Sequence, residues 1–264
     1  MRRYVKTIFQ ICSFFCFKAT PFLLATCLIL ASGYEAESTV AISDKTPGMG
    51  SRGTVTDIDG NHYGIVMIGD QEWMAENLRT TRFRNGDPIP NMTEDREWRE
   101  LSRTETGAWA YNENDTAYGD LYGKLYNWYA VDDVRGLCPE GWTIPSDEDW
   151  NTMERYLGLD EVQANWTRRR GREINLGGKL KATIDLWEAP NRGANNASGF
   201  SALPGGSRNY NGTFGGIGFG GLWWTSTEHS ENFAWLRNLT YFYSDNYRYF
   251  FFKTNGYSVR CIRH

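Results

Sequence analysis

The side chains with the chemistry of a binding site gather in one long polar segment, from Trp187 to Gly221. The segment is rich in glycine and asparagine and poor in aliphatic residues, so it must lie over a core rather than build one. Aromatic rings stack on sugar rings, and amide and guanidinium groups hydrogen-bond to hydroxyls. We predict that four side chains converge here on one exposed concavity and bind a neutral polyhydroxylated ligand without a metal. The four are Trp187, Asn191, Arg192 and Arg208.

An irregular loop with no ligand would have the same composition, and that alternative stays open. A second polar segment, Arg168–Arg172, carries four arginines in an otherwise acidic protein. Its ordinary interpretation is a solvated surface loop. It is also where a recognition surface should be sought if the first four side chains are buried or point apart.

Recognisable catalytic and metal motifs do not occur in the chain. There is no G-x-S-x-G, P-loop or dinucleotide fingerprint, and no helix pattern follows the glycine run at 215–221. The three histidines, His62, His229 and His264, lack the spacing of a zinc site. Carboxylates are abundant, so composition alone does not exclude glycoside hydrolysis, but none stands in a catalytic frame. We therefore predict a non-catalytic protein.

The N-terminal residues 1–33 have the layout of a signal peptide. Three basic residues in the first six positions precede an apolar run, Ile8–Leu30, and the small residues Ala31-Ser32-Gly33 follow. An uncleaved membrane anchor and lipid attachment at Cys27 are the alternatives. We expect a protein that is secreted or held at the outer surface of a bacterial cell, with contact to the membrane only through this leader or that lipid.

The charge balance argues against nucleic acid as a partner. The chain has 28 Lys and Arg against 32 Asp and Glu, and the leader holds four of the basic residues and no acid. The exported part is therefore clearly acidic, whereas nonspecific nucleic-acid binding depends on positive charge.

Only two cysteines, Cys138 and Cys261, lie outside the leader. In an exported chain, two cysteines most simply form one disulfide. Two buried free thiols are the alternative.

The remaining pattern predicts short strands with few helices. Residues 34–53 read as a flexible spacer, and 54–264 as one domain that opens with a meander over 54–77. Ser146 and the acids after it predict a helix over 147–157, with Trp150, Tyr156 and Leu157 buried. A second helix is predicted over 122–131, and strands over 222–227, 233–241, 247–253 and 257–262.

Six segments, in order, resemble the Fibrobacter succinogenes major paralogous domain, a family of exported bacterial proteins. They are Gly69–Leu78, Tyr122–Trp128, Cys138–Ser146, Gly199–Gly206, Trp223–Thr227 and Ser258–Cys261. The family's fold is similar in outline to C-type-lectin-like and formylglycine-generating-enzyme domains, and the segment Ile144–Trp150 resembles one in the latter. The resemblance implies an α+β domain with a short twisted antiparallel sheet and long irregular loops, but no particular activity.

The same resemblance bears on cofactors. Formylglycine-generating oxidases use a cysteine pair in the site, and Cys261 instead matches the closing strand. We predict no cofactor. Calcium is the alternative, because Glu188–Asn191 resembles the Glu-Pro-Asn motif of C-type lectins with one residue inserted. The expected function is a non-catalytic recognition module for a glycan or a surface protein. An extracellular carbohydrate-active enzyme and a purely structural surface component remain the alternatives.

Overall fold

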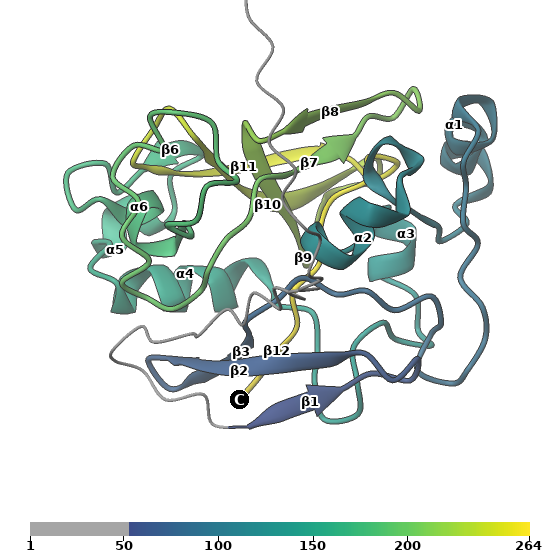
Figure 1. Ribbon diagram of the computed structural model, residues 1–264, viewed down its shortest axis with the longest axis horizontal. Coiled ribbons are helices and arrows are strands. Elements are labelled where there is room, and N and C mark those ends of the chain that lie inside the picture. The colour runs from purple at the N-terminus through teal and green to yellow at the C-terminus, as the bar shows by residue number, and fades with distance from the viewer. Residues whose placement is uncertain (1–52) are drawn as a thin grey trace, which may run out of the picture. The chain divides into compact units, whose positions relative to one another are not determined.

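The computed structural model describes residues 53–264, which form an α+β fold with few helices, as the sequence predicts (Figure 1). The predicted signal peptide, 1–33, and nearly all of the spacer lie outside the described residues. Within 53–264, no helix is long and apolar enough to cross a membrane.

The helices are short. They are α1 (Asp95–Thr104), η1 (Asn112–Asn114), α2 (Thr116–Tyr122), α3 (Trp128–Val131), α4 (Asp147–Tyr156), α5 (Glu161–Ala164) and α6 (Leu176–Leu180). The strands of the first half are β1 (Thr54–Thr56), β2 (His62–Ile68), β3 (Gln71–Met74), β4 (Trp109–Ala110), β5 (Leu125–Tyr126) and β6 (Arg168–Arg170). Those of the second half are β7 (Gly205–Arg208), β8 (Phe214–Ile217), β9 (Gly220–Ser230), β10 (Phe233–Thr240), β11 (Asn246–Phe252) and β12 (Ile262–Arg263).

These strands make a four-stranded sheet, β1-β2-β3-β12, a six-stranded sheet, β6-β11-β10-β9-β7-β8, and the pair β4-β5. All the pairings between strands are antiparallel except that of β7 with β9. Figure 1 shows the six-stranded sheet above the four-stranded one, with α4 between them. β12 pairs with β3, so the last strand closes on the opening meander.

Helix α4 begins as the sequence predicts. The Ser146 hydroxyl accepts a hydrogen bond from the Asp149 amide at 3.1 Å, and the Asp149 carboxylate accepts one from the Ser146 amide at 2.8 Å. This reciprocal capping box satisfies two amides that the first turn leaves free.

We expect Ser146→Ala to lower the free energy of unfolding by about 1 kcal/mol, because it removes this cap. Urea denaturation followed by tryptophan fluorescence measures the loss. Ser102→Ala is the control, because Ser102 is exposed inside α1 and caps no helix, and its effect should stay under about 0.5 kcal/mol. Equal effects of the two substitutions would contradict the capping role.

The buried face of α4 differs from the predicted one. Trp150 and Met153 are fully buried, but Tyr156 is 64% exposed. At about 100° per residue, Tyr156 lies about 120° from Trp150, whereas Glu154 lies only about 40° away. The helix therefore buries Glu154, at 0% exposure, and leaves Tyr156 in solvent.

An aromatic cluster joins the two larger sheets through α4. The ring centroids of Trp73 on β3 and Trp150 on α4 lie 5.1 Å apart, edge to face. Phe200 and Trp223 complete the cluster at 5.4 and 6.4 Å from Trp150. Such edge-to-face pairs stabilise beyond the area that they bury, so this cluster fixes the position of α4.

The predicted disulfide between Cys138 and Cys261 is present, with Cα atoms 6.0 Å apart. Both cysteines are buried in the larger hydrophobic core. The bridge ties the segment before α4 to the residue before β12.

Three local predictions are wrong. Of the predicted strand 257–262, only Ile262 belongs to a strand, β12. The predicted helix over 122–131 is interrupted, because Gly123 has φ of +81° and a Cβ there would lie 2.7 Å from the Asn77 side chain. β5 therefore separates α2 from α3. The segment from Trp187 to Gly221 is not irregular throughout, because β7 and β8 form an antiparallel hairpin inside it.

Candidate functional site

Trp187 does not face solvent. Its side chain is 5% exposed and lies in the core that also contains Trp150. The indole Nε1 donates a hydrogen bond to the Ala202 carbonyl at 3.0 Å. Trp187 therefore anchors its own loop to the core.

Arg208 is also a structural residue. It is fully buried on β7, and its guanidinium carbon lies 4.4 and 4.6 Å from the ring centroids of Trp98 and Phe214. Its Nε donates to the Gly212 carbonyl at 2.8 Å, and its Nη atoms donate to the carbonyls of Met92 and Thr93. These contacts tie β7 to the segment before α1.

The other two predicted residues lie nearer the surface. Asn191 is half-buried, and its Nδ2 donates to the Ala182 carbonyl at 3.1 Å. Arg192 is exposed, with its guanidinium carbon 5.3 Å from the ring centroid of Phe242. With Trp187 and Arg208 buried, the predicted convergence of four side chains on one exposed concavity is wrong. In a segment with few aliphatic residues, the tryptophan and the arginine serve as its anchors.

The calcium motif can be located as well. Glu188 is exposed, and the Asn191 amide is held by the backbone of Ala182. Among residues 53–264, no group of three or more His, Cys, Asp and Glu side chains could hold a metal ion.

A cavity of about 490 Å³ lies elsewhere, where β6, β11 and β10 adjoin at one end of the six-stranded sheet. This volume is typical of small-molecule sites. Arg168, Arg169, Asn238, Thr240, Tyr243, Asp245 and Tyr247 line it. Two of these residues belong to the basic segment Arg168–Arg172.

Strand register places the lining residues together. Tyr247 on β11 pairs with Arg169 on β6 on one side and with Asn238 on β10 on the other. Directly paired residues of antiparallel strands share a face, and Thr240 lies on that face because it is two residues after Asn238. The connection 241–245 between β10 and β11 supplies Tyr243 and Asp245.

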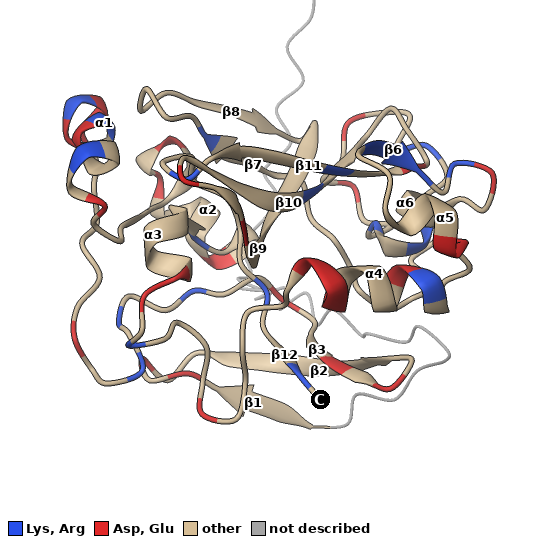
Figure 2. Ribbon diagram, turned by 180° about the vertical axis from the view of Figure 1, so that it is seen from behind, with Lys and Arg blue, Asp and Glu red and all other residues tan. Residues whose placement is uncertain are grey.

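The opposite face of the same three strands carries a buried charge network. Arg170, Arg237 and Arg248 reach under the sheet to two acids of α4, Asp147 and Glu154. Arg237 bonds both acids, at 2.6 and 2.8 Å, Arg248 bonds Asp147 at 2.6 Å, and Arg170 bonds Glu154. Figure 2 shows the acidic residues of α4 and the basic strand β6.

This network fixes the strands that form the cavity. Burial by itself would raise the pKa of Asp147, but the charges and hydrogen bonds of Arg237 and Arg248 outweigh it and lower that pKa.

The interpretation of Arg168–Arg172 as a solvated loop is wrong in part. Arg168–Arg170 is a strand, and the Arg170 side chain is fully buried.

Two residues that line the cavity each carry a side-chain oxygen without a partner. Asn238 Oδ1 and Thr240 Oγ1 are both buried, and neither forms a hydrogen bond within residues 53–264. Most buried polar atoms in folded proteins are hydrogen-bonded. Because both residues line the cavity, a rotation of either side chain would present its unpaired oxygen to a ligand there.

Asp245 adds a carboxylate to these two atoms. It is 5% exposed and forms no ion pair in the described part of the chain. Burial raises its pKa, while Arg169, Arg172 and Lys181 oppose that rise. A buried carboxylate with a raised pKa in a cavity is typical of functional sites.

The connection that carries Asp245 is held tightly from behind. A Cβ at Gly177 would lie 2.2 Å from the Asp245 carbonyl oxygen, so only glycine lets α6 approach this closely. The Gly177 amide donates to the Ser244 carbonyl at 2.8 Å. Lys181 Nζ donates to the carbonyls of Thr240 and Tyr243, at 3.0 and 2.9 Å, and burial lowers the pKa of Lys181 to about 8.

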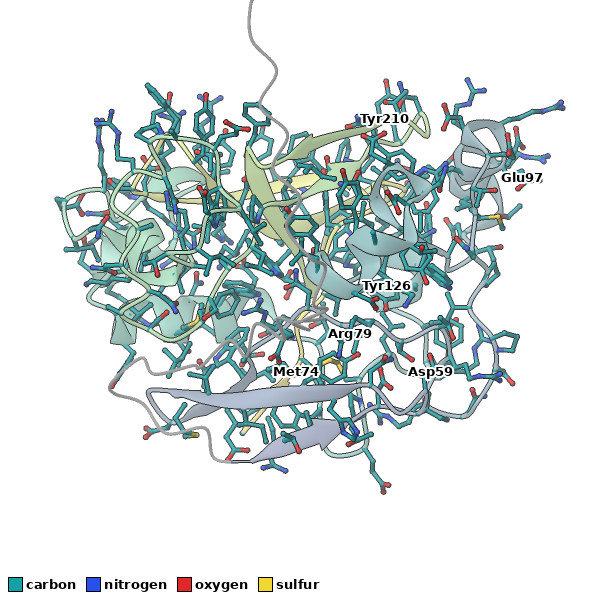
Figure 3. All side chains as sticks on the ribbon, viewed as in Figure 1. Asp59, Met74, Arg79, Glu97, Tyr126 and Tyr210 are labelled. Carbon is teal, nitrogen blue, oxygen red and sulfur yellow. A yellow bond between two sulfur atoms is a disulfide. The ribbon has the colours of Figure 1, made fainter. Side chains whose placement is uncertain are left out.

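Arg169 forms the wall opposite this connection. Its guanidinium carbon lies 3.3 Å from the ring centroid of Tyr243, and its nitrogens form no hydrogen bond or ion pair within residues 53–264. Tyr210, an exposed aromatic residue of the segment from Trp187 to Gly221, does not belong to this wall. Figure 3 places Tyr210 between β7 and β8, at the opposite end of the sheet from β6.

Sequence reasoning missed most of the lining residues, because the strands 233–241 and 247–253 were interpreted only as structure. One signal was present: Asn238 and Thr240 lie two residues apart in the predicted strand 233–241, and polar residues at that spacing indicate a polar face. Nothing in the sequence indicates which segment would face it.

No curated protein and no solved structure matches the chain, so the more specific lectin-like outline stays a prediction. The model of the Fibrobacter succinogenes major domain matches residues 66–263, most of the chain. The protein therefore belongs to the Fibrobacter succinogenes major domain family.

Proposed function

We propose that this protein is a secreted or cell-surface, non-catalytic recognition module that binds a glycan in the cavity between β6, β10 and β11. One observation carries the proposal: Asn238 and Thr240 line this cavity, and their buried oxygens Asn238 Oδ1 and Thr240 Oγ1 have no hydrogen-bond partner in 53–264. Sugar hydroxyls both donate and accept hydrogen bonds, so they match a carbonyl, a hydroxyl and the carboxylate of Asp245.

The aromatic lining fits the same ligand. Tyr247 is half-buried in the floor between Arg169 and Asn238. A tyrosine ring offers an apolar surface to the carbon face of a sugar and keeps a polar hydroxyl at its rim. Aromatic surface beside a few polar groups is the usual composition of a small-molecule site.

The cavity residues favour a binding site over a glycosidase active site. Glycosidases flank the scissile bond with a pair of carboxyl groups, and Asp245 is the single acid among the residues that line the cavity. The outer location is supported by the predicted leader and by the disulfide, because disulfides persist outside the reducing cytoplasm.

A glycan array with the purified protein tests the proposal. Thr240→Val should then weaken binding to the best array ligand about tenfold, which is one lost hydrogen bond. The free energy of unfolding should stay unchanged or rise, since the substitution removes an unpartnered buried hydroxyl. Titration calorimetry and urea denaturation measure the two quantities.

Thr213→Val is the control, because Thr213 is exposed between β7 and β8, and it should leave the affinity unchanged. Absence of any glycan ligand, or equal affinity of the Thr240→Val protein, would show that this cavity is not a glycan site. Release of shortened oligosaccharides during incubation would favour the carbohydrate-active enzyme instead.

A further inference from the structure

We infer that the glycan bound in this cavity is acidic, with a carboxylate held by Arg168 and Arg169 and hydroxyls held by Asp245, Asn238 and Thr240. The inference rests on the proposed function and names its ligand class, a saccharide that contains a uronic acid.

The first support is the contrast between the arginines of the sheet. Arg170, Arg237 and Arg248 are paired with Asp147 or Glu154 beneath the sheet. Arg168 and Arg169 line the cavity, and in the described part of the chain their guanidinium nitrogens form no hydrogen bond or ion pair. Arg168 is the first residue of β6 and has φ of +79°, so it departs from the regular alternation of faces and lines the cavity with Arg169. Two neighbouring arginines thus keep their donors free.

The second support is the geometry of Arg169. Its guanidinium lies over the Tyr243 ring at 3.3 Å. Stacking on an aromatic face fixes the plane of a guanidinium and leaves its N–H edges free. A planar fork of this kind matches a carboxylate through two parallel hydrogen bonds.

The third support is that opposite charges share the cavity without pairing. Asp245 feels the charges of Arg169, Arg172 and Lys181 but forms an ion pair with none of them. A ligand between the two sides would present an anion to the arginines and hydroxyl donors to Asp245. A uronic acid ring carries both groups.

The unpaired Asp245 also selects among anions. Its negative charge repels any anion in the cavity, and a phosphate carries up to two charges where a carboxylate carries one. A saccharide carboxylate therefore suits the cavity better than a phosphate.

Three matched pairs of trisaccharides test the inference: the trimers of galacturonate, glucuronate and mannuronate, each with the neutral hexose trimer of the same linkage. We expect at least one acidic trimer to bind tenfold or more tightly than its neutral partner by titration calorimetry. Arg169→Gln and Arg168→Gln should each reduce that preference to about threefold or less. Arg99→Gln, which changes an exposed arginine on α1 away from the cavity, should retain it.

Urea denaturation of each variant separates loss of binding from loss of folding. Failure of all three acidic trimers to bind more tightly than their partners overturns the inference, as does tighter binding of a sulfated or phosphorylated trimer. If neutral glycans alone bind, the proposed function stands and only the acidic ligand class fails. If no glycan binds here or on the array, both fail.

Discussion

Glu154→Gln should lower the free energy of unfolding by about 3–5 kcal/mol, because it removes one partner of a buried ion-pair network. Glu154 has no exposed surface and bonds Arg170 and Arg237, neither of which has an exposed side chain. Without its charge, Arg170 would lose its ion-pair partner, and Arg237 and Arg248 would share the single carboxylate of Asp147. The arginines cannot regain solvent without separating α4 from β10 and β11.

Chemical denaturation measures this loss, and circular dichroism checks that the variant still folds. Glu161→Gln is the matched control: Glu161 also pairs with an arginine, Arg155 at 3.5 Å, but its side chain is 73% exposed. An exposed pair contributes at most about 1 kcal/mol. If both substitutions cost the same, the network does not hold the sheet to α4.

Replacing Cys138 and Cys261 together by alanine should cost up to about 5 kcal/mol. The disulfide closes a loop of 123 residues, and cross-linking a loop of that length removes much of the entropy of the unfolded chain. Both cysteines lie in the core, within 1% of full burial, so their removal also forfeits packing. Urea unfolding of the double variant and of the parent measures the difference.

Reduction with a thiol reagent provides the control for this prediction. It should destabilise the parent protein toward the level of the double variant and leave the double variant unchanged. Free thiols in the parent, detected by alkylation and mass spectrometry of the denatured protein, would contradict the bridge.

The charge network and the cavity are two sides of one structure. Arg170 and Arg248 face α4, while Arg169 and Tyr247, next to them in the chain, face the cavity. Because successive strand residues alternate between faces, the network fixes the register on which the cavity depends. Glu154→Gln is therefore expected to disturb the cavity as well as the stability. For this reason the binding tests substitute only residues on the cavity side.

Local signals in the sequence determined several features. Ser146, the acids after it and the spacing of Trp150 and Met153 define α4, because capping and helical periodicity act within a few residues. The disulfide followed from cysteine number, since only Cys138 and Cys261 lie outside the predicted leader. The ordered family segments gave the α+β class.

Only the tertiary structure decided which polar side chains are exposed. Arg208 reads as a surface residue because its neighbours in the chain are polar, yet the carbonyls that bury it belong to Met92 and Thr93, more than 110 residues away. The cavity depends in the same way on the pairing of Arg169 with Tyr247 across 78 residues. The type of a residue determines which groups its side chain can bind. Whether that side chain is exposed depends on distant segments, because burial is a property of the packed chain.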